Sequence, residues 1–327
     1  MNFRSLVTSE NSNGKFENNI IQKSTDKLPE GDILVKVEYS SLNYKDALSA
    51  TGNKGVTRQY PHTPGIDAAG IIEKSSDTNL PKGLSVIVSG YDLGMNTDGG
   101  FGQYIRVPSS WIVKMPSGLS TEKAMALGTA GLTAGLSVKA LQENSKIISK
   151  SVLVSGATGG VGCIAIKLLS CLRANITAIT GKKDKYEFLK NLGAKNILDR
   201  DDFIKSTRLP MSKGLYDLAI DVSGGKTLSA ILASMKYNGT IVCCGNVGGS
   251  IFETSVFPFI LRGNRLIGID SASKPIKEKT EIWNHFANDW RLPNLNKLYR
   301  IIDLKELPSE IEKILVGKQT GRVVVKH

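Results

Sequence analysis

The chain has 327 residues, 41% of them hydrophobic and 22% charged, with a formal net charge of +12. This length and composition fit a globular protein of two domains and exclude a disordered or fibrous chain. No uninterrupted apolar stretch reaches about 18 residues, and the N-terminus lacks the apolar segment of a signal peptide. We therefore expect a cytoplasmic protein without a membrane partner.

Cysteine spacing and charge distribution exclude two further classes. The four cysteines form no CxxC pair, so a disulfide framework is not predicted. The basic residues are scattered and form no run of five or six, which does not predict a nucleic-acid partner. Ligands that carry several phosphates explain the positive charge equally well.

The first third of the chain is predicted to be β-rich. Short apolar runs separated by Gly and Pro occupy Ile33–Ser41, Gly65–Glu73, Leu84–Gly90 and Phe101–Val107. From about Ser120 an Ala- and Leu-rich stretch predicts a helix instead.

The middle of the chain alternates between strand and helix patterns. Six apolar strands with intervening helices imply a parallel sheet that is covered on both faces. The predicted strands are Ser151–Ser155, Asn175–Thr180, Lys195–Asp199, Tyr216–Gly224, Gly239–Gly245 and Arg265–Ser271. The tail ends in a helix at Glu306–Gly317 and a strand at Gly321–Lys326, which we expect to fold back onto the β-rich third.

A glycine-rich turn joins the first strand of this sheet to its helix. Its pattern is Ala157-x-Gly159-x-x-Gly162, a variant of the GxGxxG dinucleotide fingerprint in the right strand-to-helix context. Gly159 would let the main chain approach a pyrophosphate, and Gly162 would allow close packing of the helix. The predicted cofactor contacts are Ala157, Thr158, Gly159, Gly160, Val161 and Gly162.

The end of the second strand discriminates between NAD and NADP. Thr180 and Gly181 stand where a carboxylate would bind a ribose 2′-hydroxyl, and Lys182 follows them. A 2′-phosphate needs donors and positive charge, so the sequence predicts NADPH. Arg200, directly after the third strand, is a second candidate contact. Asp184 is interpreted as a residue of the first helical turn that interacts with the helix dipole.

The order of these segments resembles the medium-chain dehydrogenase/reductase family. The segments are a β-rich region, "AMALGTAGLTA" and "SGATGGVG". The resemblance implies an α/β protein with a GroES-like catalytic domain and a doubly wound Rossmann domain. We place the catalytic domain at residues 1–123, with 275–327 returning to it, and the NADP-binding domain at 124–274.

Many members of this family hold a catalytic zinc through a Cys and the His of a GHE motif. Here the matching segment is Gly65-Ile66-Asp67, and no cysteine precedes Cys163. The thiolate and imidazole ligands of such a site are missing, so we expect no metal.

Among zinc-free branches, the chain resembles the acryloyl-CoA reductase group of quinone-oxidoreductase-like proteins. The shared stretches are "SSLNYKDALSATG", "PGIDAAG", "AMALGTAGLTA", "PFILRG" and "GIDS". The resemblance implies NADPH-dependent reduction of acryloyl-CoA to propanoyl-CoA, with hydride added to the β-carbon. Asn246 in "CGNVGG" and the lack of a Trp in "DGGFGQY" depart from the group's pattern. Alternatives are reduction of quinones or other enals and enones and, outside enzymes, a structural or RNA-binding relative.

The resemblance also suggests residues for the chemistry. Tyr44 follows a strand and would donate a hydrogen bond or proton to the substrate, or only pack on the cofactor ring. Asn43 is a second donor candidate or a helix cap. Lys45 and Asp46 are interpreted as a charged pair on a helix surface, and Asp67 as a structural hydrogen-bonding group.

The remaining expectations concern the nicotinamide and the assembly. By analogy with the family's fold, the nicotinamide should lie beside Gly245, Ile269 and Ser271. The substrate is expected to be a small-molecule acyl-CoA, and the assembly a homodimer.

Overall fold

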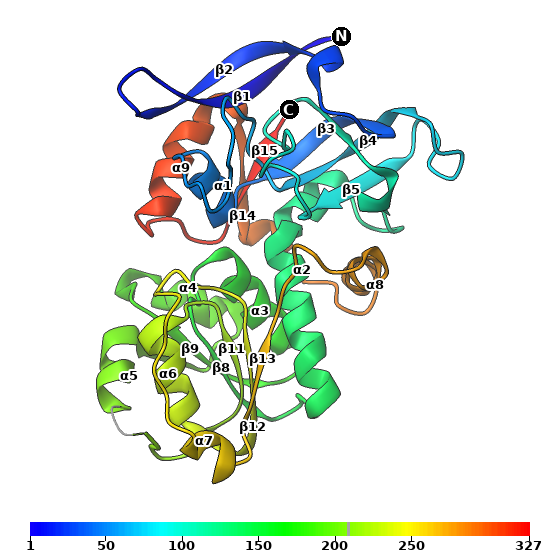
Figure 1. Cartoon of the computed structure of the whole chain (residues 1–327). Coiled ribbons are helices and arrows are strands. Elements are labelled where there is room, and N and C mark those ends of the chain that lie inside the picture. Colours follow the sequence, from blue (N-terminus) through cyan, green and yellow to red (C-terminus); the bar gives the residue numbers. More distant parts are fainter. Residues whose placement is uncertain (208–209) are drawn as a thin grey trace. The chain divides into compact units, whose positions relative to one another are not determined.

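The structure, a computed structural model, describes residues 1–207 and 210–327. The chain forms two compact units (Figure 1). Unit 1 comprises Met1–Leu132 and Ser271–His327, and unit 2 comprises Thr133–Asp270. Our domain limits at 123/124 and 274/275 differ from this division, although our first limit and the division at 132/133 both fall inside helix α2 (Thr121–Asn144).

Unit 1 is built on a seven-stranded sheet with the path β14-β15-β3-β4-β5-β7, in which β6 also pairs with β3. A separate hairpin of β1 and β2 belongs to the same unit. The strands are β1 (Asn2–Glu10), β2 (Phe16–Ser24), β3 (Ile33–Ser41), β4 (Asp67–Ser75), β5 (Ser85–Ser89), β6 (Tyr104–Val107), β7 (Ile112–Lys114), β14 (Tyr299–Asp303) and β15 (Arg322–Lys326).

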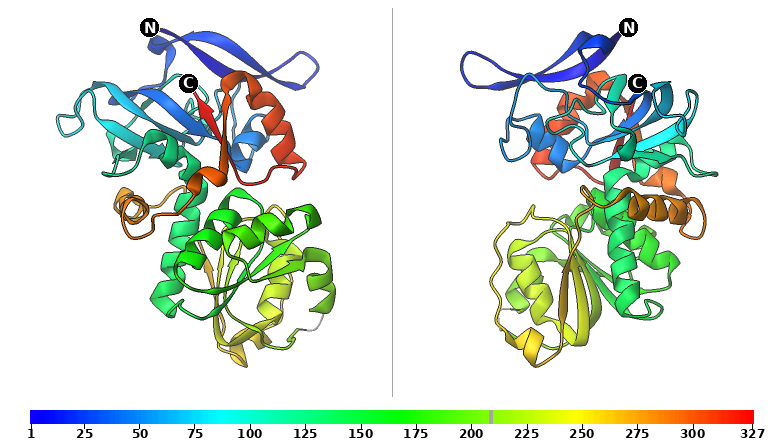
Figure 2. Two further views of the ribbon diagram at one scale, coloured as in Figure 1. Left: turned by 180° about the vertical axis from the view of Figure 1, so that it is seen from behind. Right: turned by 45° about the vertical axis from the view of Figure 1, so that its right-hand side comes forward.

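The C-terminal strand completes this sheet, as the sequence predicts. β15 pairs antiparallel with β3, with Val324 opposite Ser41. The preceding helix α9 (Leu307–Leu315) packs against α1 (Tyr44–Ser49), and both contribute to one buried apolar cluster (Figure 2). Leu307 and Ile311 are four residues apart and so lie on one face of α9, and both are buried in that cluster. The fold therefore places the first and last parts of the chain next to each other within unit 1.

Unit 2 is a six-stranded parallel sheet in the order β10-β9-β8-β11-β12-β13. This is the strand order of the Rossmann fold, and the order reverses between β8 and β11. Each of the six strands overlaps its predicted range, with ends that differ by up to four residues. They are β8 (Ser151–Val154), β9 (Asn175–Thr180), β10 (Asn196–Asp199), β11 (Tyr216–Asp221), β12 (Met235–Cys243) and β13 (Arg265–Gly268).

The helices of unit 2 connect these strands as right-handed βαβ units require. Their apolar faces meet the sheet in a core that includes Leu153, Ala219, Ile231 and Ile241. The helices are α3 (Gly160–Cys171), α4 (Tyr186–Leu192), α5 (Arg200–Ser206), α6 (Gly225–Ala233) and α7 (Phe257–Ile260).

Helix α2 is interrupted at Gly128. This residue has φ +52° and ψ −155°, a conformation that only glycine adopts readily. By length and composition α2 could cross a membrane, but 83% of its most apolar window is buried inside the protein. Together with the break at Gly128, this burial identifies α2 as a core helix.

Candidate functional site

The glycine turn of unit 2 follows β8 and leads into α3. Gly156 has φ +56°, and a Cβ on Gly162 would lie 2.4 Å from the Gly156 carbonyl oxygen. In this turn main chain packs directly against main chain, and Gly162 is needed because a side chain would not fit at this position. Gly159 is the N-cap of α3, whose first turn directs N–H groups out of the helix. Such a helix N-terminus at the strand-order reversal is suited to binding a diphosphate.

Asp221, at the end of β11, anchors this turn to the neighbouring loop. Its buried carboxylate accepts a hydrogen bond from Ser155 Oγ at 2.6 Å and from the N–H groups of Ser223 and Gly224 at 3.2 and 2.8 Å. Burial raises the pKa of Asp221, while these donors act in the opposite direction. Sequence reasoning missed Asp221, although a carboxylate that ends a buried apolar strand is a usable signal.

The loops after β11 and β12 are also in main-chain contact. A Cβ on Gly245 would lie 2.1 Å from the Val222 carbonyl oxygen, and Gly248 N–H donates to the Ser223 carbonyl at 2.7 Å. Ile269 N–H donates to the Cys243 carbonyl at 2.9 Å, directly after β13. The predicted contacts Gly245 and Ile269 thus lie at the carboxyl ends of β12 and β13.

A basic group lies at the ends of β9 and β10. The Arg200 guanidinium is close to Gly181, because a Cβ on Gly181 would be 3.5 Å from Arg200 Cζ. Lys182 N–H donates to Thr180 Oγ1 at 3.1 Å, and partial burial lowers the pKa of the Lys182 ammonium. Thr180, Gly181, Lys182 and Arg200 are therefore brought together at one edge of the sheet. Asp184 forms an ion pair with Lys185 at 2.9 Å.

In unit 1, Asn43 and Tyr44 lie where β3 ends and α1 begins. Tyr44 is the first residue of α1 and is partly exposed, with no hydrogen-bond partner for its hydroxyl among the described residues. The Asn43 amide, in contrast, is engaged: Nδ2 donates to Asp67 at 2.8 Å and Oδ1 accepts from Arg322 at 3.1 Å. Of the two candidates, only Tyr44 carries a polar group that is free to meet a ligand.

Asp67 and Arg322 are the charged centre of a buried network. Asp67 accepts from Ser41 Oγ at 2.7 Å and from both N–H and Oγ1 of Thr129 at 2.8 and 2.7 Å. The break at Gly128 frees the Thr129 N–H for this bond. Arg322, 2% exposed, donates to Ser41 Oγ at 2.9 Å and to the carbonyl oxygens of Leu42 and Ala126. Asp67 is thus the structural hydrogen-bonding group that the sequence suggested, whereas Arg322 was missed.

The expectation that Asp46 lies on a helix surface is wrong. Its side chain is fully buried, and its two oxygens accept from the N–H groups of Asn43 and Ile66 at 2.7 and 2.8 Å. Burial, reinforced by the charge of Asp67, raises the pKa of Asp46 to about 7. Lys45 is partly exposed, so the two residues do not share an environment. The helical period alone could not show this, because α1 is less than two turns long.

Ser271, the last predicted cofactor contact, lies in unit 1 rather than at the end of the Rossmann sheet. The loop between β5 and β6 holds the main chain beside it: Tyr91 N–H donates to the Ala272 carbonyl at 2.9 Å. Across residues 1–207 and 210–327, no group of three or more His, Cys, Asp or Glu side chains is arranged to hold a metal ion.

Two family models match the chain. Residues 29–117 match the alcohol dehydrogenase GroES-like domain, and residues 160–288 match the zinc-binding dehydrogenase domain. Acrylyl-CoA reductase AcuI of Ruegeria pomeroyi is 38% identical over 98% of this chain and 97% of its own length. The chain belongs to the medium-chain dehydrogenase/reductase family.

Other members of this dehydrogenase/reductase family are similarly related. Bacillus subtilis YhfP, provisionally named a quinone oxidoreductase, is 40% identical over 93% of this chain and 92% of its own length. The structure of YhfP with NAD bound matches with a TM-score of 0.96, covering both chains fully. The yhdH oxidoreductase of Salmonella enterica, in complex with NADP, matches with a TM-score of 0.95 at 38% identity, again over both full chains.

Proposed function

We propose that this protein reduces the C=C bond of an enoyl-CoA, with acryloyl-CoA as the first substrate to test and NADPH as the reductant. The observation that carries the proposal is the basic, carboxylate-free end of β9 beside the glycine turn, in a chain related over its full length to AcuI. When bound, NADPH would supply a hydride for the β-carbon of the alkene.

The residues of unit 2 fit the phosphates of NADPH. The turn at Gly156–Gly162 offers main-chain N–H groups to the diphosphate, and Asp221 fixes the adjoining loop by its three accepted bonds. Lys182 and Arg200 would pair with the 2′-phosphate, and Thr180 would donate to it. An aspartate at the end of β9 would repel that phosphate, and none is present there.

Tyr44 would act on the substrate. Negative charge gathers on the thioester oxygen as the β-carbon is reduced, and a donor aimed at that oxygen lowers the barrier. The Tyr44 hydroxyl can donate a hydrogen bond, and no other contact among the described residues engages it. Asn43 would hold the start of α1 through Asp67 and Arg322, which fixes the direction of Tyr44.

Steady-state rates test the substrate. The purified protein is assayed for NADPH oxidation with acryloyl-CoA, crotonyl-CoA and a naphthoquinone, and we expect kcat/KM to be highest for acryloyl-CoA. A higher kcat/KM for the naphthoquinone would reject the proposal in favour of a quinone reductase, the function given provisionally to YhfP. The same assay with NADH tests the cofactor, which matters because YhfP was crystallised with NAD.

The proposal extends to a cytoplasmic homodimer. β13 is an edge strand of the unit 2 sheet, and several large apolar side chains are exposed in residues 247–261, which precede it in the chain. Ile251 is 83% exposed and Ile260 is 67% exposed, more than a monomer's surface favours for such side chains. Sedimentation velocity on the purified protein would test this, and a monomer at micromolar concentration would overturn it.

A further inference from the structure

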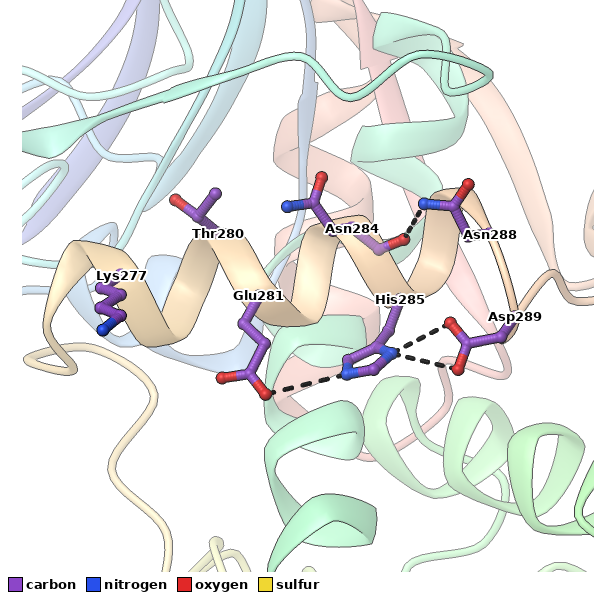
Figure 3. Close-up of a pocket in the computed structure, with 7 residues that line it drawn as sticks. All are labelled: Lys277, Thr280, Glu281, Asn284, His285, Asn288 and Asp289. Carbon is purple, nitrogen blue, oxygen red and sulfur yellow. Dashed lines mark hydrogen bonds and ion pairs between the residues drawn. The ribbon is translucent and has the colours of Figure 1, made fainter.

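Helix α8 (Ile276–Ala287) presents two different faces. Figure 3 shows its polar side, with Lys277, Glu281 and His285 along a shallow pocket; His285 lies between Glu281 and Asp289 and stacks on Trp290. These contacts are ordinary pairs on one helix face. The buried side is unusual, because it includes a lysine, Lys279, that is only 1% exposed.

The Lys279 ammonium is held by main-chain oxygens. Nζ donates to the carbonyl oxygen of Ser89 at 2.7 Å and to that of Ala272 at 2.8 Å. It also lies 3.4 Å from the centre of the Tyr91 ring, a cation–π contact in a desolvated place. Moving an ammonium from water into the protein interior is costly unless protein groups replace its hydrogen bonds to water, so these acceptors must be well placed.

The same segment is held from the loop after β5. Tyr91 has φ +53°, which directs its N–H to the Ala272 carbonyl and its hydroxyl to the Lys274 carbonyl at 3.0 Å. A Cβ on Gly90 would lie 2.9 Å from Ala272 Cα, so the two stretches of main chain touch. Ser89 is opposite Asp67 in the β4–β5 pairing, so the strand that binds Lys279 is paired with the strand that contributes Asp67 to the buried network.

We infer that Lys279 is a positioning residue for cofactor binding: by fixing the Ala272 carbonyl, it sets the place of Ser271. This inference rests on the proposed function and on the expectation, drawn from the family resemblance, that Ser271 lies beside the nicotinamide. Neither Lys279 nor Tyr91 would touch the ligand. Their effect would be confined to the nicotinamide end of NADPH, and binding of its phosphates would not depend on them.

Binding of two probes tests this separation. Calorimetry gives Kd for NADPH and for adenosine 2′,5′-bisphosphate, which contains the ribose-phosphate end and no nicotinamide. For Lys279→Met we expect Kd for NADPH to rise about tenfold or more and Kd for the bisphosphate to stay within about twofold. Lys277→Met, an exposed lysine on the same helix, is the matched control and should change neither. Lys279→Arg, which keeps the charge and donors, should recover part of the loss.

Tyr91→Phe keeps the test usable if Lys279→Met does not fold. It removes only the bond to the Lys274 carbonyl, and we expect about a threefold rise in Kd for NADPH alone. If both Kd values stay at the wild-type level in the folded variants, or rise together, Lys279 has only a structural role and the inference is wrong. These binding measurements contain no acyl-CoA, so their result does not depend on the substrate. If the wild-type protein had no activity with acryloyl-CoA, the proposed function would be rejected but the inference about Lys279 would not.

Discussion

The two units build their candidate sites by different means. In unit 2 the glycine turn packs main chain against main chain, so that a Cβ on Gly162 would lie 2.4 Å from the Gly156 carbonyl oxygen, and Asp221 is its side-chain anchor. In unit 1 the position of Tyr44 depends on buried charged side chains, chiefly Asp67 and Arg322. A site of the first kind fails when a side chain is added, and one of the second kind fails when a side chain is removed.

Arg322→Met should give the largest effect. It leaves the carbonyl oxygens of Leu42 and Ala126 and the Asn43 Oδ1 without their buried charged donor. Because each buried acceptor left unsatisfied costs about 1–3 kcal/mol, we expect a total loss of about 3–5 kcal/mol. Urea unfolding followed by tryptophan fluorescence would measure it. All three tryptophans, Trp111, Trp283 and Trp290, lie in unit 1, so the signal reports this unit. A loss below about 1 kcal/mol would show that the network does not stabilise the unit.

Gly162→Ala tests the main-chain site. The added Cβ must displace the Gly156 carbonyl, and we expect Kd for NADPH to rise about 100-fold, equivalent to roughly 2.7 kcal/mol. Gly268→Ala is the control, because its Cβ would meet nothing within 4 Å and its φ is not positive. Equal affinity of the Gly162 variant and the wild type would mean that the turn does not form the diphosphate site.

Asp46 gives the stability of unit 1 a dependence on pH. Its pKa is about 7 in the folded protein against 3.8 for the free side chain, so the folded state holds a proton that the unfolded state releases. The resulting stabilisation is complete below pH 3.8 and is lost as pH rises through about 7.

The free energy of unfolding of Asp46→Asn, taken relative to wild type, should therefore increase between pH 5 and pH 8 by on the order of 2 kcal/mol. Burial lowers the pKa of His62, and that of His327 to about 4, which acts in the opposite direction. Both histidines are present in wild type and variant, so their contributions cancel in the difference. A difference that does not change with pH would contradict the raised pKa.

Tyr44→Phe separates a catalytic donor from a packing residue. If the hydroxyl donates in the transition state, kcat for acryloyl-CoA should fall about tenfold, with a smaller rise in KM for NADPH. An unaltered kcat would restrict Tyr44 to packing.

The double variant Thr180→Asp with Lys182→Ala should have the smallest effect. A carboxylate at the end of β9 repels the 2′-phosphate and accepts from a ribose hydroxyl, so the preference for NADPH over NADH should narrow about fivefold. The ratio of kcat/KM for the two cofactors measures this. An unchanged ratio would assign the phosphate to other residues.

The sequence predicted unit 2 better than the site in unit 1, for a physical reason. The Rossmann strands and glycine turn are local patterns, readable within windows of about 20 residues. The network joins Arg322 to Asn43 and Asp67, residues far apart in the chain, and no periodicity signals that they meet. The burial of Asp46 was missed because a charged residue in a short helix is usually exposed. Arg322 becomes recognisable only when the strand pairing is known.

The pairing of β15 with β3 has a consequence for biosynthesis. β3 ends at Ser41, but β15 begins at Arg322, so the ribosome must add residues 42–321 and then β15 before this ladder can close. At roughly 5–20 residues per second, some tens of seconds pass between the synthesis of β3 and that of β15. The strands of unit 2 are contiguous in the sequence and can assemble during that interval. Unit 1 therefore begins to be synthesised before unit 2 and is completed after it.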